Sequence, residues 1–210
     1  MTVPDAENRR SRASLRLLAL AGFMGAGKTT VGRLLATQPG LSSPGWRFLD
    51  VDAEIESATG STIAELFTRH GEPWFRDLEH RTIQRLIPTE PAAWAEHTQP
   101  RADSGEAPQS GIVLALGGGA IEDARNRELL LHSEGVKLVH LEVTLPEAVR
   151  RCTADAVNLR PVLADRERLT ARYEQRLGLY RLAHLTIPVD GLAPEQVARQ
   201  IEDWLRTNPS

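Results

Sequence analysis

The feature that most constrains this chain is an alternation of short apolar segments with amphipathic helical segments. Short, continuously apolar strands separated by helices form a parallel sheet that is covered on both faces. The sequence therefore predicts an α/β fold, and ligands of such sheets gather at the carboxyl ends of the strands. The predicted strands are 15–23, 47–52, 112–120, 136–143 and 184–190. Helical patterns follow the turn at 24–27 and cover 62–69, 73–87, 123–132, 146–153, 166–182 and 194–206. Thr62, with Glu65 three residues on, predicts a capping box at the start of the first of these ranges.

The bulk composition excludes several classes of partner. The 210 residues are 41% hydrophobic and carry a net charge of −3, so neither nucleic acid nor a membrane surface is expected as a partner. No apolar run reaches the ~20 residues that a membrane span needs. Cys152 is the only cysteine, which favours a reducing compartment, and we expect a cytoplasmic protein.

A glycine-rich loop follows the first predicted strand. Residues 22–29, "GFMGAGKT", match the phosphate-binding pattern G-x-x-x-x-G-K-[ST] between a strand and a helix. Glycines let several backbone N–H groups point toward a polyphosphate, and the helix that follows directs its positive end at the same anion. Lys28 would contact the β- and γ-phosphates of ATP, and the Thr29 hydroxyl would bind Mg²⁺. The predicted nucleotide contacts are Gly25, Ala26, Gly27, Lys28, Thr29 and Thr30.

The second predicted strand ends on two carboxylates. In "FLDVD", Asp50 and Asp52 would point the same way unless the strand has already turned. One could hold the water shell of Mg²⁺, and the other could accept a proton or a hydrogen bond from an attacking hydroxyl. The alternative is a helix cap plus a solvated acid, with Asp52 as the N-cap. The neighbouring phosphate loop favours the catalytic interpretation.

Three consecutive glycines, 117–119, follow the apolar segment "IVLAL". Three glycines indicate that the backbone must approach another group closely and expose its N–H groups. A plain flexible turn is the alternative.

The predicted helix 73–87 places two charged residues on its apolar face. Phe75, Leu78, Thr82, Ile83, Leu86 and Ile87 share that face at about 100° per residue. Arg76 and Glu79 fall inside it, away from the polar side. An inward arginine indicates either an internal ion pair with Glu79 or a buried ligand anion, and both can hold together.

Taken in order, these blocks resemble the shikimate kinase family over about residues 17–205. The resemblance rests on "GFMGAGKTTVGRLLA", "FLDVDAEIE", "GEPWFRDLE", "LALGGGA", "LRPVL" and "RLGLY". It implies a P-loop, nucleoside-monophosphate-kinase-like fold with three layers and a five-stranded parallel sheet. It also implies phosphorylation of the shikimate 3-hydroxyl by Mg·ATP, a step toward chorismate and the aromatic amino acids.

The resemblance also implies a role for each matching residue on the acceptor side. Arg76 and Arg176 would clamp the shikimate carboxylate, because a rigid guanidinium suits a carboxylate better than lysine does. Asp52 would contact the reacting hydroxyl, and the glycines would offer backbone N–H groups to the ring hydroxyls. The acceptor contacts are therefore predicted to be Asp52, Arg76, Gly118, Gly119 and Arg176.

On the nucleotide side, the resemblance implies a mobile lid at about 153–167. Its Arg160 would contact the transferring phosphate, and Arg151 would pack on adenine beside the loop 190–194. Lys28, Asp52 and Arg160 would be the catalytic residues, and Thr29 and Asp50 would serve the metal. Gly178 stands where the family often carries proline.

The organisation implied is a disordered tail at 1–13 and one domain over 14–210. Substrate-binding helices would span about 53–87, and a proline-rich surface insertion about 88–111. We expect a monomer with two small-molecule partners, shikimate and ATP.

Two other functions stay open from the sequence. A gluconate-type kinase could use the same core, and the paired arginines would suit a carboxylate in either case. An ATP-dependent interaction module, with the insertion as its contact surface, is the third hypothesis.

Overall fold

The computed structural model describes residues 15–37, 46–87, 111–154 and 166–208. These residues include one five-stranded sheet in the order β2-β3-β1-β4-β5, and every neighbouring pair is parallel. The prediction of a five-stranded parallel sheet is confirmed. The strands are β1 Leu17–Ala21, β2 Trp46–Asp50, β3 Gly111–Ala115, β4 Val136–Glu142 and β5 Leu185–Pro188.

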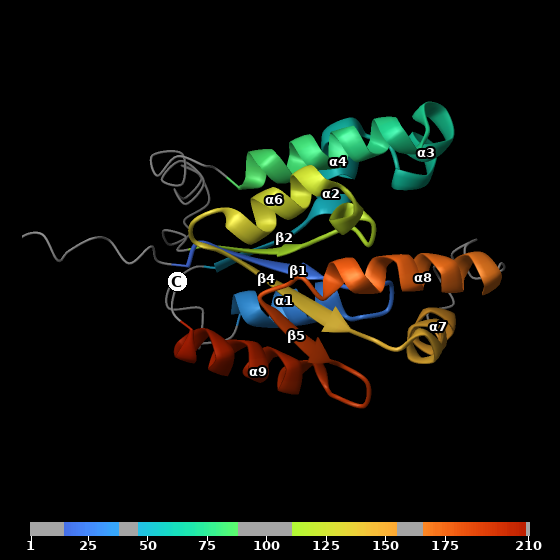
Figure 1. Cartoon of the computed structure of the whole chain (residues 1–210). Helices are drawn as coiled ribbons and strands as arrows, with labels where there is room; N and C mark the ends of the chain where they lie inside the picture. Colours follow the sequence, from blue (N-terminus) through green and yellow to red (C-terminus); the bar gives the residue numbers. More distant parts are fainter. Residues whose placement is uncertain (1–14, 38–45, 88–110, 155–165, 209–210) are drawn as a thin grey trace, which may run out of the picture.

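Helices lie on both faces of this sheet and form three layers (Figure 1). In the view of Figure 1, α4 and α6 lie above the sheet and α1 and α9 lie below it. The strand β4 points toward α7, which lies beyond its carboxyl end. The helices are α1 Lys28–Thr37, α2 Val51–Thr59, α3 Ile63–His70, α4 Glu72–Leu86, α6 Ala124–His132, α7 Leu145–Ala154, α8 Arg166–Tyr180 and α9 Pro194–Thr207.

The centre of the sheet is the centre of the core. All five residues of β1 and all five of β3 are buried, as expected for strands that are covered on both faces. A glycine-containing turn follows each of these two parallel strands, so the phosphate loop and the triple glycine lie at the same carboxyl edge of the sheet.

The predicted end of the second strand is wrong by two residues. Strand β2 ends at Asp50, and α2 begins at Val51, about two residues before the start of 53 expected for the substrate-binding helices. The Asp50 carboxylate caps this helix by accepting a hydrogen bond of 3.1 Å from the backbone N–H of Asp52. Asp50 is therefore the N-cap, and Asp52 lies in the first turn of the helix.

The third predicted strand is also shorter than expected. It ends at Ala115 rather than at Ala120, and the 3₁₀ turn η1, Ala120–Glu122, follows the glycines. The capping box predicted for the helix α3 is confirmed, since Thr62 and Glu65 exchange hydrogen bonds of 2.8 and 3.3 Å.

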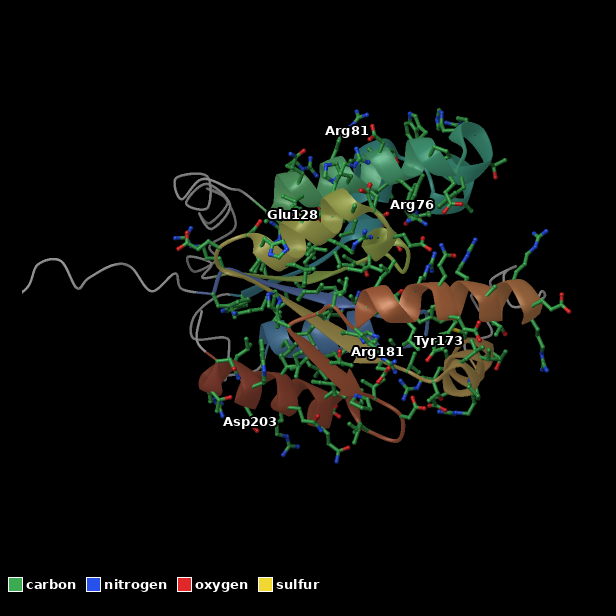
Figure 2. All side chains as sticks on the ribbon, in the orientation of Figure 1. Arg76, Arg81, Glu128, Tyr173, Arg181 and Asp203 are labelled. Atoms are coloured by element: carbon green, nitrogen blue, oxygen red, sulfur yellow. The ribbon has the colours of Figure 1, made fainter. Side chains whose placement is uncertain are left out.

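The apolar face predicted for α4 is confirmed. Phe75, Thr82, Ile83 and Leu86 are buried on it together with Glu79. Figure 2 shows Arg76 on the side of α4 that faces α8, whereas Arg81 points to the opposite side. The unusual inward placement of Arg76 is thus a feature of the fold.

Several predictions fall on residues outside the described ranges. These are the tail 1–13, Arg160, nearly all of the insertion and most of the lid. Among the described residues, no helix combines the length and the apolar character that a membrane crossing requires.

Candidate active site

The phosphate loop joins β1 to α1. Gly25 and Gly27 adopt φ angles of +74° and +88°, a region in which side chains with a Cβ are strained. A Cβ at Gly25 would also lie 2.9 Å from the carbonyl oxygen of Ala148. The Lys28 ammonium donates to the carbonyl oxygens of Gly22, at 2.8 Å, and Phe23, at 3.2 Å. The lysine thus lies folded back over the loop that it follows.

Thr29, the next residue, connects the loop to β2. Its hydroxyl donates to Oδ2 of Asp50 over 3.0 Å, so two hard oxygen ligands lie side by side next to the loop. Magnesium in nucleotide sites takes one or two protein oxygens and completes its shell with phosphate and water. This pair fits that pattern, although no cluster of three or more His, Cys, Asp or Glu residues suited to a metal occurs in the described ranges.

Asp52, Gly117 and Glu79 meet beside this pair. A Cβ added to Gly117 would lie 2.5 Å from Oε1 of Glu79 and 3.0 Å from Oδ1 of Asp52. Glycine at this position therefore makes room for two carboxylates. Neither Gly117 nor its two glycine neighbours has a positive φ, so close approach, and not a left-handed turn, explains the glycine at 117.

Glu79 is the most deeply buried charge of the site. Its side chain is 1% exposed, and Oε2 accepts a hydrogen bond of 2.7 Å from the Arg76 guanidinium. Burial raises the pKa of Glu79 to about 7, and this effect outweighs the opposite influence of Arg76. Within the described structure, Oε1 of Glu79 is buried without a hydrogen-bond partner.

Arg76 is held from several sides. Besides Glu79, Glu72 accepts a hydrogen bond of 3.1 Å from Nη2 of Arg76. The guanidinium lies 5.8 Å from the ring centre of Phe67 and 5.6 Å from that of Phe75. A Cβ on Gly119 would overlap this guanidinium, so the third glycine also accommodates a charged side chain.

The second predicted arginine comes from α8. Arg176 is 7% exposed, and its Nε and Nη2 atoms each donate to one oxygen of Glu122 over 3.1 Å. One turn further along α8, the Tyr180 hydroxyl donates to the carbonyl oxygen of Gly118 over 2.5 Å. The glycine loop and α8 are thereby fastened together.

Glu122 also faces the first arginine. Its Oε2 lies 3.8 Å from Nη2 of Arg76, so one carboxylate joins guanidinium groups from α4 and α8. Sequence reasoning missed this residue. An acid three residues after a glycine triplet was the available signal, but nothing local links it to residue 176.

Arg151 lies on the other side of the phosphate loop. It donates to the carbonyl oxygens of Gly25, at 3.2 Å, and Val189, at 3.0 Å, while Glu147 accepts from its Nε. The Arg151 side chain therefore links the phosphate loop to Val189, the residue that precedes the loop 190–194.

One run of contacts thus links most of the predicted residues. It starts at Thr29 and passes through Asp50 and Asp52 to Gly117, Glu79 and Arg76, and it ends through Glu122 at Arg176. Ala26 is buried within the phosphate loop, and Thr30 is exposed on α1.

The sheet order, the phosphate loop and the oxygen ligands beside it define a P-loop kinase of the α/β class. The family model described as "Shikimate kinase" matches residues 24–93 and 105–206. The chain belongs to the shikimate kinase family, and the resemblance seen in the sequence is confirmed.

Similar proteins agree in sequence and in structure. A shikimate kinase of Frankia casuarinae is 40% identical over 86% of this chain and 68% of its own length. One from Moorella thermoacetica is 36% identical over 90% of this chain and 94% of its own. The solved structure of shikimate kinase from Acinetobacter baumannii in complex with shikimate is 35% identical, with a TM-score of 0.71 over 93% of this chain and 96% of that chain.

Proposed function

We propose that this chain transfers the terminal phosphoryl group of ATP to the 3-hydroxyl of shikimate, giving shikimate 3-phosphate and ADP. Family membership supports the reaction. The observation that carries the proposal for this chain is the run of contacts from the phosphate loop to two guanidinium groups, the half-buried Arg76 and the buried Arg176. It puts phosphate-binding and carboxylate-binding chemistry at one edge of the sheet.

The phosphate loop would bind the polyphosphate of ATP. Backbone N–H groups at Gly25–Thr30 would surround the phosphates, and Lys28 would exchange its carbonyl partners for phosphate oxygens. Thr29 and Asp50 would hold Mg²⁺, directly and through water. The metal supplies positive charge that neutralises the β- and γ-phosphate oxygens when it is bound.

Arg76 and Arg176, here called the acceptor clamp, would bind the carboxylate of shikimate. Both guanidinium groups are restricted before an acceptor binds, because Glu79 and Glu72 hold Arg76 and burial limits the movement of Arg176. A preformed clamp orients the ring without the entropic cost of ordering two long side chains. Backbone N–H groups of Gly118 and Gly119 would contact ring hydroxyls.

Asp52 would accept the proton, or a hydrogen bond, from the attacking hydroxyl. It lies in the first turn of α2, two residues after the proposed metal ligand, and next to Gly117. A carboxylate there is suitable as an orienting base for phosphoryl transfer. The remaining positive charge would come from Arg160 in the predicted lid, and Arg151 would pack on adenine.

We further propose that the enzyme works as a cytoplasmic monomer. The cytoplasmic location is proposed from the lone Cys152, which favours a reducing compartment.

The direct test is ADP release with MgATP and each of two acids, shikimate and gluconate. We expect turnover with shikimate that exceeds ATP hydrolysis without acceptor by about 100-fold or more. Turnover with gluconate and not with shikimate would contradict the proposal and support the alternative acceptor. Binding of ATP with no transfer to either acid would instead support an interaction module.

A further inference from the structure

Glu122 already occupies part of the acceptor clamp. Its two oxygens pair with the Nε and Nη2 atoms of Arg176, which form one of the guanidinium edges suited to bidentate binding of a carboxylate. The same residue lies 3.8 Å from Nη2 of Arg76. A carboxylate of the protein itself therefore sits between the two groups that an acceptor carboxylate would use.

Both cations of the clamp have partners before any acceptor binds. Arg76 pairs with Glu72 and Glu79, and Arg176 pairs with Glu122, so both cations already face carboxyl groups of the protein. An acceptor carboxylate that entered beside Glu122 would meet a negative charge a few ångströms away. Repulsion at that distance in a half-buried site is appreciable.

The carboxylates of Glu79 and Glu122 differ in their freedom to move. Glu79 is 1% exposed and lies inside the packed face of α4, whereas the side chain of Glu122 is 22% exposed. The backbone at Glu122 is fixed, because Arg127 donates hydrogen bonds of 2.8 Å to the carbonyl oxygens of Ile121 and Glu122. Rotation of the Glu122 side chain can therefore release Arg176 without any change in the turn.

We propose that Glu122 is a specificity-determining residue that competes with the acceptor's carboxylate for Arg176 and must turn away when an acidic acceptor binds. The inference rests on the proposed function. It predicts that Glu122 weakens the binding of every acceptor that carries a carboxylate and leaves neutral analogues unaffected. It also predicts that the affinity for ATP does not depend on Glu122.

The test compares Glu122→Gln with the wild type by calorimetric titration of shikimate and by steady-state kinetics. Removing one competing charge should lower the Kd and KM for shikimate by about three- to tenfold. The KM for ATP should stay within about twofold of the wild-type value. Glu128→Gln is the matched control, because Glu128 lies on α6 with its side chain 76% exposed (Figure 2).

The carboxamide analogue of shikimate separates charge competition from a structural effect. It lacks the negative charge, so wild type and Glu122→Gln should bind it equally. Glu122→Ala, measured in parallel with thermal unfolding, provides a second variant if the glutamine chain does not fold. Weaker or unchanged shikimate binding in a folded variant would overturn the inference, and so would an equal gain for the carboxamide. Absence of shikimate turnover in the wild type would instead contradict the proposed function.

Discussion

At the scale of single residues, the site consists of charges that partner one another in a buried, glycine-lined edge. Glycines 117 and 119 are required there because the space of a Cβ is taken by Glu79 and Arg76. The inward position of Arg76 on α4 is thus explained by its buried partner Glu79 and, in the proposed function, by the carboxylate of shikimate. These roles lead to three predictions for individual side chains.

Replacing Asp52 by asparagine should remove the charge near the acceptor and leave the phosphate loop unchanged. We expect kcat for shikimate phosphorylation to fall by about 100-fold or more, while the Kd for ATP changes by less than about twofold. Kinetics and ATP titration measure the two effects. Glu54→Gln, on the same helix, is the control, and a parallel loss of ATP affinity in Asp52→Asn would contradict the assigned role.

Replacing Arg76 by lysine should weaken the acceptor clamp selectively. A point charge cannot reproduce the planar fork that pairs with a carboxylate, so the KM for shikimate should rise by about tenfold. The KM for ATP should remain nearly constant. Arg81→Lys makes the same change on the outward side of α4 (Figure 2). A shikimate KM that is unchanged in Arg76→Lys would remove Arg76 from the clamp.

Glu79 should make stability depend on pH in a definite direction. Its pKa rises from 4.5 to about 7 on folding because of burial, so the folded state binds this proton more tightly than the unfolded state. Between about pH 4.5 and 7, this carboxyl therefore lowers the free energy of unfolding as the pH rises. Glu79→Gln lacks that contribution, so its stability relative to wild type should improve from pH 5 to about pH 7 and level off by pH 8.

Urea unfolding of both proteins at several pH values measures this difference. Burial lowers the pKa of His140 to about 4, which gives an opposite trend below about pH 6.5, but both proteins share that residue. Its effect cancels in the comparison. A difference in stability that does not change with pH would show that Glu79 keeps an ordinary pKa.

At the scale of elements, the sequence predicted the features that depend on residues close together in the chain. The apolar face of α4 and the capping box of α3 follow from spacing along one helix, and both are confirmed. The start of α2 was expected about two residues too late because the alternating "LDVD" also suits a strand, and the side chain of Asp50 sets the true start by capping the helix. The contact of Glu122 with Arg176 joins residues 54 positions apart, and no local pattern encodes it.

Gly178 provides a prediction for α8, the helix that carries Arg176. The helix continues through it to Tyr180, and a Cβ at Gly178 would meet nothing within 4 Å. Alanine should therefore raise the free energy of unfolding by about 0.5–1 kcal/mol, because glycine loses more backbone entropy on folding.

Gly60→Ala is the matched control for Gly178→Ala. A Cβ at Gly60 would also meet nothing within 4 Å, but the φ angle is +66° at the end of α2. This substitution should destabilise the protein by about 1 kcal/mol. Chemical denaturation measures both variants, and a loss of stability in Gly178→Ala would show that α8 needs glycine there.

At the scale of the whole molecule, the alternation of strands and helices predicted the sheet, since each apolar segment must be buried on both faces. The same rule predicted that the phosphate loop, Asp50 and the glycine triplet would share one edge, and they do. The ion pairs that join α4, η1 and α8 could not be predicted, because they depend on how separate elements pack. Arg160 and the lid stay predictions, since they lie outside the described residues.

The central claim is that one edge of this sheet transfers phosphate from ATP to a ring hydroxyl of an acid held by two arginines. Phosphorus NMR of the products formed from MgATP and shikimate tests it most directly. The account predicts a new phosphate monoester whose signal is coupled to the proton at carbon 3, in amounts equal to the ADP formed. Release of inorganic phosphate with no ester, or an ester on another hydroxyl, would contradict it.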